Sequence, residues 1–399
     1  MSGQIVIVGA GQAGLQIAES LRTEGFDGDV ILLGKERHAP YQRPPLSKAW
    51  LAGETADDRL TIRGPDFLAA KKIDLRVGVE VERIDVGARK AFLVDGSAFS
   101  WTGLALATGA RARRPDLPGA ELPHVRVLRD FEDAKEISHR LDEAANVVII
   151  GGGFIGLEVA VAARKRGCAT VVVEALDRLM ARAVTPEISA FFADLHRAHG
   201  VELFFGEQVA EISDAGVKTA SGALFPADLV VLGVGAVPND ELAVAAGLDV
   251  SRGIVVDDCG RTSATDVVAA GDCAVLRRGD GALRRFESVQ YAVEGAKAAD
   301  AALLGRSKPF SAAPWFWSDQ YDVKLQMAGS SENHDALIER RSGDKAFSLF
   351  YYRQGELVGV DSVNRPGEHL LARKLLDAHF SPEPALVGDP ARDLRLLLR

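Results

Sequence analysis

A short supersecondary pattern that occurs twice constrains this chain most strongly. Residues 4–8 (QIVIV) are an apolar run that predicts a buried strand, and a glycine-rich turn at residues 9–14 (GAGQAG) follows it and opens a helical stretch. Residues 147–150 (VVII) are likewise followed by a turn at 151–156 (GGGFIG) and a helix predicted over 159–166. A repeat of a whole strand–turn–helix unit indicates two copies of one nucleotide-binding fold.

The glycines of the first turn have the spacing that a dinucleotide requires. Gly9 permits the tight turn, Gly11 lets backbone amides approach a pyrophosphate, and Gly14 lets the helix pack closely on the strand. The N-terminus of the helix then faces the phosphates. A strand predicted over 267–272 (VVAAGD) ends on Asp272, which we expect to bond a ribityl or pyrophosphate group.

An acidic residue at the end of the second strand of such a unit binds the ribose hydroxyls. In the first unit the candidate is Glu36, although Lys35 stands where an acid is first expected. In the second unit Glu174 occupies the expected place, and its carboxylate would repel a 2′-phosphate, which favours NADH over NADPH. Arg178 and Arg182 follow it and leave NADPH as an alternative.

The remaining sequence predicts an α/β protein with two Rossmann-like domains and an α+β C-terminal domain. We expect the first dinucleotide domain to comprise residues 1–112 and 240–316, the second residues 113–239, and the C-terminal domain residues 317–399. A helix rich in small residues is predicted over 292–304. Alternating segments within the last 80 or so residues indicate an antiparallel sheet.

Composition excludes several classes of function. The formal charge of −9 disfavours nucleic-acid binding, and no apolar run approaches the ~20 residues of a membrane span, so we expect a cytoplasmic protein without a membrane or nucleic-acid partner. The cysteines Cys168, Cys259 and Cys273 form no C-x-x-C pair. His196 and His199 could share a helix face, but with no third ligand we interpret them as surface histidines and expect no metal site.

Motifs along nearly the whole chain resemble those of the FAD-dependent pyridine nucleotide–disulfide oxidoreductases. They are residues 40–48 (PYQRPPLSK), 107–109 (ATG), 152–158 (GGFIGLE), 234–239 (VGAVPN), 270–272 (AGD), 287–290 (ESVQ) and 314–320 (PWFWSDQ). Within this superfamily the chain is similar to the ferredoxin reductases of bacterial cytochrome P450 and Rieske dioxygenase systems, the putidaredoxin reductase type. The resemblance implies a glutathione reductase-like fold, with FAD in the first dinucleotide domain and NADH in the second.

The resemblance also implies roles for single residues. Lys48 would lie beside the flavin N5, and Glu158 would be its ion-pair partner, facing the nicotinamide; these two are the expected catalytic residues. Val81 would hold the adenine through its backbone, and Trp317 would lie near the isoalloxazine. The expected FAD-binding residues are Gly9, Gly11, Gly14, Glu36, Arg43, Lys48, Val81, Thr108, Gly109, Asp272, Val289 and Trp317. The expected NAD-binding residues are Gly151, Gly153, Ile155, Gly156, Glu158, Glu174 and Gly235.

The function that the resemblance implies is an FAD-containing NAD(P)H:ferredoxin oxidoreductase. FAD would take a hydride from NADH and pass single electrons to a 2Fe-2S ferredoxin that supplies a cytochrome P450 or an aromatic-ring dioxygenase. Residues 41–48 contain no cysteine, so a thiol relay is not expected. Arg285, Arg306 and Lys308 are candidate docking cations. We expect a monomer or weak homodimer. The alternatives are a rubredoxin reductase, an NADH oxidase, or a redox signalling protein resembling apoptosis-inducing factor.

Overall fold

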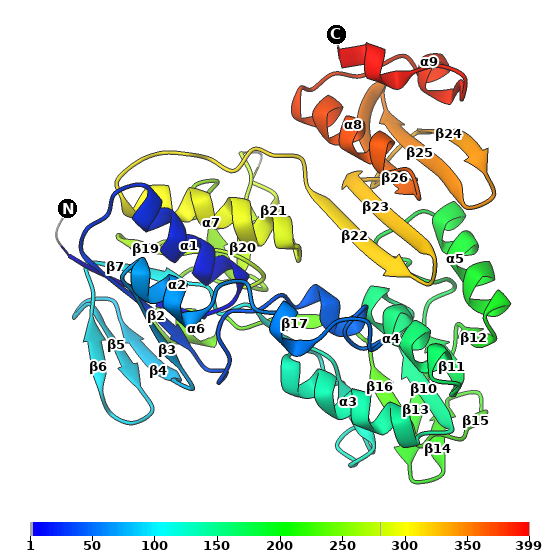
Figure 1. Cartoon of the computed structure of the whole chain (residues 1–399), viewed down its shortest axis with the longest axis horizontal. Coiled ribbons are helices and arrows are strands. Elements are labelled where there is room, and N and C mark those ends of the chain that lie inside the picture. The colour runs from blue at the N-terminus through cyan, green and yellow to red at the C-terminus, as the bar shows by residue number, and fades with distance from the viewer. Residues whose placement is uncertain (1–2, 280, 399) are drawn as a thin grey trace. The chain divides into compact units, whose positions relative to one another are not determined.

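A computed structural model describes residues 3–279 and 281–398 (Figure 1). The chain divides into two compact units, and each is built from several segments of the sequence. Unit 1 comprises Met1–Gln42, Leu60–Arg111 and Val237–Phe316. Unit 2 comprises Arg43–Arg59, Ala112–Ala236 and Trp317–Arg399. The division of the chain into three domains stays a prediction.

Unit 1 contains the first glycine turn in a five-stranded sheet with the order β19-β7-β1-β2-β3. All of its neighbouring strands are parallel. The strands are β1 (Gln4–Val8), β2 (Asp29–Gly34), β3 (Ile73–Val77), β7 (Gly103–Leu106) and β19 (Val267–Ala269). Ile5 and Ile7 belong to the core on one face, and Val6 and Val8 to the core on the other. Because both faces of the sheet are covered, β1 is a continuous apolar run, as predicted.

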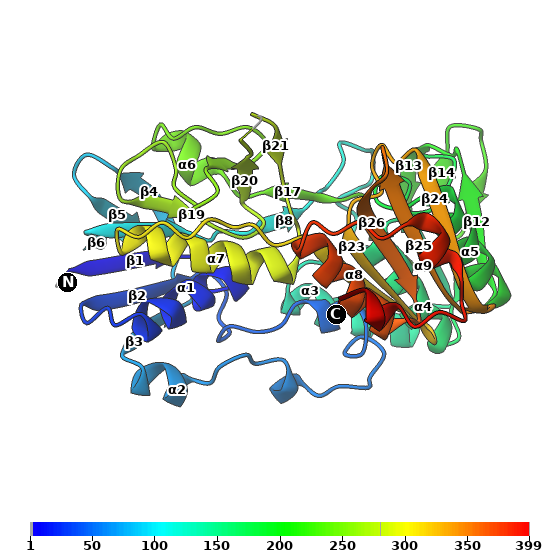
Figure 2. The ribbon, with the colours of Figure 1, turned by 90° about the horizontal axis from the view of Figure 1, so that it is seen from above.

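Two helices cover one face of this sheet, α1 (Gln12–Thr23) and α7 (Val289–Leu303), which pack against each other (Figure 2). Elements on the other face include two small sheets. Their strands are β4 (Val81–Asp85), β5 (Lys90–Leu93) and β6 (Ala98–Ser100), and β18 (Ile254–Val256), β20 (Ala274–Arg277) and β21 (Leu283–Arg284). Unit 1 also contains two short helices, α2 (Pro65–Ala70) and α6 (Glu241–Ala245). The chain passes between the units within β8 (Ala110–Ala112) and β17 (Ala236–Pro238).

Unit 2 repeats the parallel architecture with the strand order β12-β11-β10-β16-β9. These strands are β9 (Val125–Val127), β10 (Asn146–Ile150), β11 (Ala169–Glu174), β12 (Val201–Phe205) and β16 (Leu229–Leu232). The helices of this part are α3 (Phe131–Glu143), α4 (Phe154–Lys165) and α5 (Pro186–Ala198). A three-stranded antiparallel sheet joins β13 (Val209–Ser213), β14 (Gly216–Thr219) and β15 (Leu224–Phe225). The 3-10 turns η1 (Pro44–Ser47) and η2 (Asp57–Arg59) also lie in unit 2.

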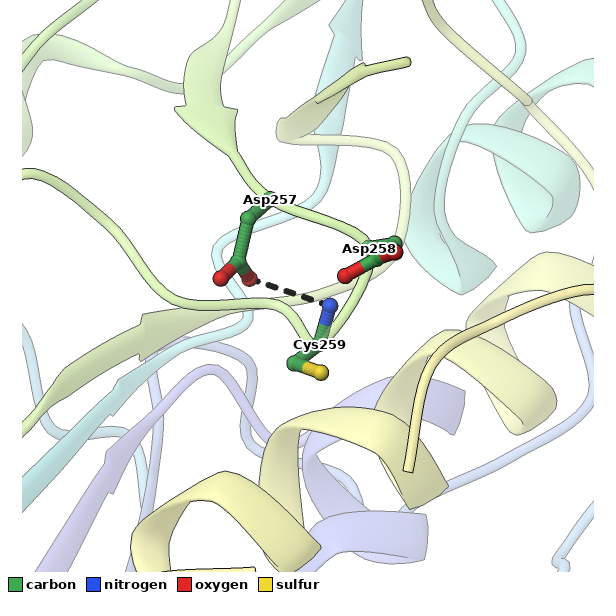
Figure 3. A group of neighbouring side chains, drawn as sticks. All are labelled: Asp257, Asp258 and Cys259. Atoms are coloured by element: carbon green, nitrogen blue, oxygen red, sulfur yellow. Dashed lines mark hydrogen bonds between the residues drawn. The ribbon is translucent and has the colours of Figure 1, made fainter. Parts of the chain in front are cut away.

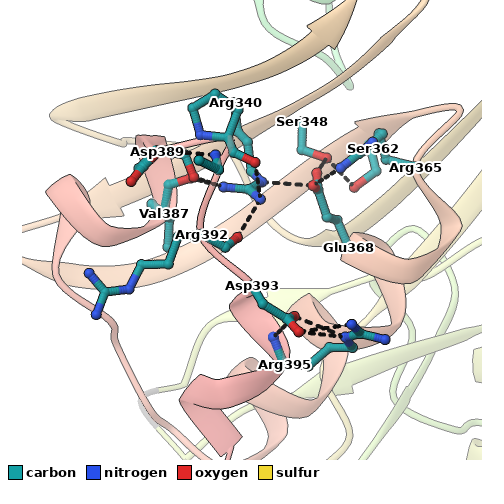
Figure 4. A network of polar contacts seen from close by, with 12 residues as sticks. Arg340, Ser348, Ser362, Arg365, Glu368, Val387, Asp389, Arg392, Asp393 and Arg395 are labelled. Atoms are coloured by element: carbon teal, nitrogen blue, oxygen red, sulfur yellow. Dashed lines mark hydrogen bonds and ion pairs between the residues drawn. The ribbon is translucent and has the colours of Figure 1, made fainter.

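The C-terminal part of unit 2 is built on a five-stranded sheet with the order β22-β23-β26-β25-β24, antiparallel from β23 to β24. Its elements are β22 (Trp315–Gln320), β23 (Val323–Gly329), β24 (Ala336–Gly343), β25 (Ala346–Arg353), β26 (Glu356–Val363), α8 (Pro366–Asp377), α9 (Pro384–Gly388) and η3 (Leu394–Leu398). A buried network holds the last segment in place (Figure 4). Arg340 pairs with Glu368 at 2.8 Å and donates to the backbone carbonyls of Val387 and Arg392.

These sheets confirm the predicted fold class, two Rossmann-like parallel sheets with an α+β C-terminal portion. Among the described residues, no helix combines the length and the apolar character that a membrane span requires.

Candidate functional site

The first glycine turn in unit 1 joins β1 to α1 and leaves room for a ligand at one position only. A Cβ on Gly9, whose φ is +113°, would lie 2.1 Å from the carbonyl oxygen of Ala107, and a Cβ on Gly14 would lie 1.9 Å from the Gly9 oxygen. A Cβ on Gly11 would meet no atom within 4 Å. Gly11 is also the N-cap of α1 and brings no capping side chain. The open space therefore lies where a helix N-terminus can receive a pyrophosphate.

The expected ribose and phosphate groups of unit 1 follow the same turn. The turn that carries Asp272 runs against the start of α1, since a Cβ on Gly271 would lie 3.0 Å from the Cβ of Ala13. Glu36 is half-buried and accepts a hydrogen bond from the Tyr41 hydroxyl. Lys35 instead forms an exposed ion pair with Glu80 at 2.7 Å. Glu36 is therefore the better candidate of the two for the FAD ribose.

Other residues expected at FAD lie at the ends of elements in unit 1. Val81 is the first residue of β4. Thr108 and Gly109 follow β7, and both bond Asn239, with 2.6 Å from the Thr108 hydroxyl to the Asn239 carbonyl. Val289 is the first residue of α7. Their contacts with FAD stay predictions.

The second glycine turn, in unit 2, has the same construction as the first. A Cβ on Gly156 would lie 2.4 Å from the Gly151 oxygen, whereas a Cβ on Gly153 would meet only the Gly233 oxygen, at 3.8 Å. Gly153 is the N-cap of α4 and brings no capping side chain. Ile155 stands in the first turn of α4 and is 43% exposed. This is again a helix N-terminus that leaves space for phosphate groups.

Glu174 ends β11, and backbone amides fix its carboxylate beside this turn. Oε2 accepts from the Gly152 amide at 2.6 Å, and Oε1 accepts from the Leu176 amide at 2.8 Å. Each carboxylate oxygen can accept a further hydrogen bond, which suits the two ribose hydroxyls. Arg178 donates to the carbonyls of Val184 and Ala181 at 2.8 and 2.9 Å, so its guanidinium is engaged within its own loop. Arg182 is exposed.

Gly235 lies in the loop after β16 with a φ of +102°, and its carbonyl accepts from the Arg113 amide at 2.9 Å. Arg43 donates to the Arg129 carbonyl at 2.9 Å. Trp317 and Ser318 are neighbours on β22 and therefore point to opposite faces of the strand. Ser318 is buried and Trp317 is half-buried.

Lys48 and Glu158, the expected catalytic pair, lie together in unit 2. Lys48 directly follows η1, Glu158 lies on α4, and their side chains form an ion pair of 2.8 Å. The Glu158 side chain is 1% exposed and that of Lys48 is 14% exposed. A hollow of about 370 Å³ adjoins both residues and is lined further by Lys165, Asp319 and Lys324. Roles at the flavin and the nicotinamide stay predictions for both residues.

Two serines that the sequence analysis did not single out complete the surroundings of Glu158. Ser47 donates to the same oxygen as Lys48, Oε2. Ser318 donates to Oε1 at 2.6 Å. The carboxylate therefore accepts from three donors. Both serines lie inside the motifs that carry the family resemblance. For Ser318, the one sequence signal of a polar contact is that it follows the aromatic stretch WFW.

The interpretation of His196 as a surface residue is wrong. His196 is 0% exposed, its Nε2 lies 2.8 Å from Gln320 Oε1, and burial lowers its pKa to about 4. His199 caps the C-terminus of α5 and stacks on Tyr321 with ring centroids 3.6 Å apart. Helical spacing alone could not show that the C-terminal sheet covers this face of α5.

One group of side chains within the described residues has the closeness that a metal ion requires, Asp257, Asp258 and Cys259 (Figure 3). Asp257 Oδ1 accepts from the backbone amides of Cys259 and Arg261 at 3.0 and 2.8 Å. These bonds close a turn, and Arg261 adds an ion pair with Asp257. The contacts of Asp257 are therefore those of a structural turn residue.

The three cysteines are free and buried. Burial raises the pKa of the Cys168 and Cys273 thiols, which keeps both protonated near neutral pH. Two of the candidate docking cations are neutralised locally, because Arg306 pairs with Glu24 and Arg285 pairs with Glu287. Docking of a partner at Arg285, Arg306 and Lys308 stays a prediction.

Comparison with known proteins identifies relatives along the whole chain. Residues 3–296 match the family model described as pyridine nucleotide-disulphide oxidoreductase, and residues 315–398 match the model described as reductase C-terminal. Rhodocoxin reductase of Rhodococcus erythropolis is 44% identical over 99% of this chain and 94% of its own length.

Two solved structures share the fold over almost their full length. The ferredoxin reductase for the CYP199A2 system from Rhodopseudomonas palustris superposes with a TM-score of 0.96 at 41% identity, covering 99% of this chain and 100% of its own. The covalent putidaredoxin reductase–putidaredoxin complex contains a chain that superposes with a TM-score of 0.95 at 38% identity, covering 99% and 98%.

Proposed function

We propose, from the premise that this chain belongs to the pyridine nucleotide-disulphide oxidoreductase family, that it is an NADH-dependent ferredoxin reductase. It is an oxidoreductase, and its cofactors are FAD and NADH. The partner that we propose is a 2Fe-2S ferredoxin, which in turn supplies a cytochrome P450 or an aromatic-ring dioxygenase. We further propose that the protein acts in the cytoplasm as a monomer or weak homodimer.

The residues present fit the two cofactors. In unit 1 the space at Gly11 would accept a pyrophosphate, and Glu36 and Asp272 would hold the ribose and the ribityl–phosphate region of FAD. In unit 2 the space at Gly153 and the carboxylate of Glu174 would hold NADH. When bound, FAD supplies an acceptor for a hydride that can release electrons one at a time.

The buried ion pair of Lys48 and Glu158 carries the proposal. Burying two charges costs more than an apolar pair of similar size, so such a pair contributes little to stability by itself. A protonated lysine at the flavin would stabilise negative charge there, and Glu158 would hold the lysine in its charged form. Glu158 would in addition face the nicotinamide and help to orient it.

The absence of a reactive thiol separates this proposal from a disulfide reductase. No cysteine lies in residues 41–48, all three cysteines are buried, and the pKa values of Cys168 and Cys273 are raised. Electrons would therefore leave for a protein carrier without a dithiol intermediate. Two relatives bear on that carrier by name, since one is a reductase for a P450 system and one is a complex with putidaredoxin.

The test is NADH-driven reduction of cytochrome c with a panel of 2Fe-2S ferredoxins and a rubredoxin. We expect reduction only when a ferredoxin is present, and a higher kcat/KM with NADH than with NADPH. Turnover with rubredoxin alone would instead support a rubredoxin reductase. Rapid oxygen consumption without a carrier would support an NADH oxidase, and slow flavin reduction with dimerisation on adding NADH would support a signalling protein.

A further inference from the structure

A chain of buried hydrogen bonds leads away from Glu158 on the side opposite to the lysine contact. Ser318 Oγ donates to Glu158 Oε1 at 2.6 Å, and Gln320 Nε2 donates to Ser318 Oγ at 3.0 Å. His196 Nε2 lies 2.8 Å from Gln320 Oε1. Ser318, Gln320 and His196 are each 0% exposed. These three residues of the hydrogen-bond chain all lie within unit 2, on β22 and α5.

The carboxylate fixes the direction of every bond in this chain. An ionised Glu158 can only accept, so the single Ser318 proton points to it. Ser318 must then accept from the amide nitrogen of Gln320, which leaves the amide oxygen facing His196. His196 therefore donates through Nε2 and is the neutral tautomer with no proton on Nδ1.

Two further features of His196 agree with this assignment. Its buried Nδ1 has no hydrogen-bond partner, as suits an atom that carries no proton. Burial lowers the pKa of His196 to about 4, so the ring is neutral near pH 7. His196 thus donates to Gln320, Gln320 donates to Ser318, and Ser318 donates to Glu158 Oε1, and hydrogen bonds aligned in one direction in this way strengthen one another.

We propose that Ser318, Gln320 and His196 are positioning residues that hold the Glu158 carboxylate, and through it the Lys48 ammonium, in the orientation that hydride transfer requires. The inference rests on the proposed function. The carboxylate divides its contacts, with Oε1 bound to this chain and Oε2 bound to Lys48 and Ser47. Without the bond to Oε1 the carboxylate can rotate, and the ammonium that is bound to its other oxygen moves with it.

The test compares Ser318→Ala and Gln320→Leu with wild type in the FAD-loaded full chain. The measured quantities are the rate of flavin reduction by NADH in an anaerobic stopped-flow, the midpoint potential of the bound FAD, and the thermal unfolding temperature. Ser318→Thr keeps the hydroxyl and is the conservative variant. Ser348→Ala is the matched control, because Ser348 is also 0% exposed and its hydroxyl bonds a buried carboxylate, that of Glu368 (Figure 4).

We expect Ser318→Ala to slow flavin reduction about tenfold, the scale of one lost hydrogen bond to a charged group. The FAD potential should shift to more negative values, because the Glu158 charge is less well neutralised. Gln320→Leu should act in the same direction and less strongly, and Ser318→Thr should restore most of the rate. Ser348→Ala should lower the unfolding temperature without changing rate or potential.

Wild-type rate and potential in both Ser318→Ala and Gln320→Leu would overturn the proposal. Equal effects of Ser348→Ala and Ser318→Ala would also overturn it, because they would reveal a general loss of stability. If a variant does not fold, Gln320→Glu replaces it, since it keeps the shape but cannot donate to Ser318 when ionised. If NADH does not reduce the wild-type flavin, the proposed function fails, whereas the FAD potential still reports on the positioning chain.

Discussion

Removing the charge of Glu174 should change which nicotinamide cofactor the protein prefers. The perturbation is Glu174→Gln, which keeps the size of the side chain and one acceptor oxygen. In the structure the carboxylate is held by the amides of Gly152 and Leu176, so its position is set before any cofactor binds. A preorganised group changes affinity more than a mobile one, because binding need not order it.

The magnitude follows from two terms. A hydrogen bond to a charged group contributes about 1.4 kcal/mol more than a neutral one, so kcat/KM for NADH should fall about tenfold. A 2′-phosphate about 4 Å from the carboxylate would experience a repulsion of about 4 kcal/mol per unit charge at an effective dielectric constant of 20. Screening by salt and movement of the phosphate reduce this term, and we expect NADPH to gain about tenfold. The ratio of the two kcat/KM values should therefore change roughly 100-fold.

The assay measures initial rates with ferricyanide as the electron acceptor, so that no ferredoxin is needed. Asp177→Asn is the control, because it removes one exposed carboxylate from the same loop. Adding Arg182→Ala to Glu174→Gln should abolish the gain for NADPH if Arg182 binds the 2′-phosphate. An unchanged NADH/NADPH ratio in Glu174→Gln, or an equal change in Asp177→Asn, would refute the reasoning.

Three further predictions concern the turn, the ion pair and a buried acid. Gly11→Ala should fold normally, because its Cβ would meet no protein atom within 4 Å, but it should retain FAD poorly, because the Cβ would occupy the space proposed for the pyrophosphate. Gly14→Ala should fail to fold, because its Cβ would lie 1.9 Å from a carbonyl oxygen. Soluble yield and FAD content distinguish the two variants. Lys48→Met should destabilise the protein by about 3 kcal/mol, because it leaves the Glu158 charge buried without a partner, and should slow flavin reduction about 100-fold. Adding Glu158→Gln removes that charge, so the double variant should regain stability in thermal unfolding but not the rate. Burial raises the pKa of Asp361 to about 7, so between about pH 4 and 7 the folded state keeps a proton on this carboxyl that the unfolded state releases. The folded state therefore loses stability as the pH rises through this range. Asp361→Asn should be more stable than wild type by up to about 4 kcal/mol at pH 8 and by little at pH 4, as measured by melting curves.

The sequence predicted the parallel strands well, because strands covered on both faces are short apolar runs bounded by glycine. Helix starts were predicted less well. The helix predicted over 159–166 begins at Phe154, directly after the N-cap Gly153, and the one predicted over 292–304 begins at Val289, after the N-cap Ser288. Hydrophobic periodicity detects the buried face of a helix, whereas its N-terminus is set by capping and by turn geometry.

The surroundings of Glu158 could be predicted only in part. The resemblance placed Lys48 beside Glu158, but it gave no role to Ser47 or Ser318. These serines lie 111 and 160 positions from Glu158 in the sequence. The burial of His196 could not be predicted either, since it depends on contacts between α5 and the C-terminal sheet. Such contacts between distant segments leave no periodic signal in one sequence.

The most direct test of the central claim is the anaerobic reduction of a 2Fe-2S ferredoxin by NADH through this protein, followed by the visible spectra of flavin and cluster. The account predicts that NADH reduces the flavin first, and that two ferredoxins are then reduced per NADH, with release of one proton and no thiol intermediate. A flavin that NADH reduces but that passes no electrons to any ferredoxin, or a reaction that an alkylating agent for thiols abolishes, would contradict the account.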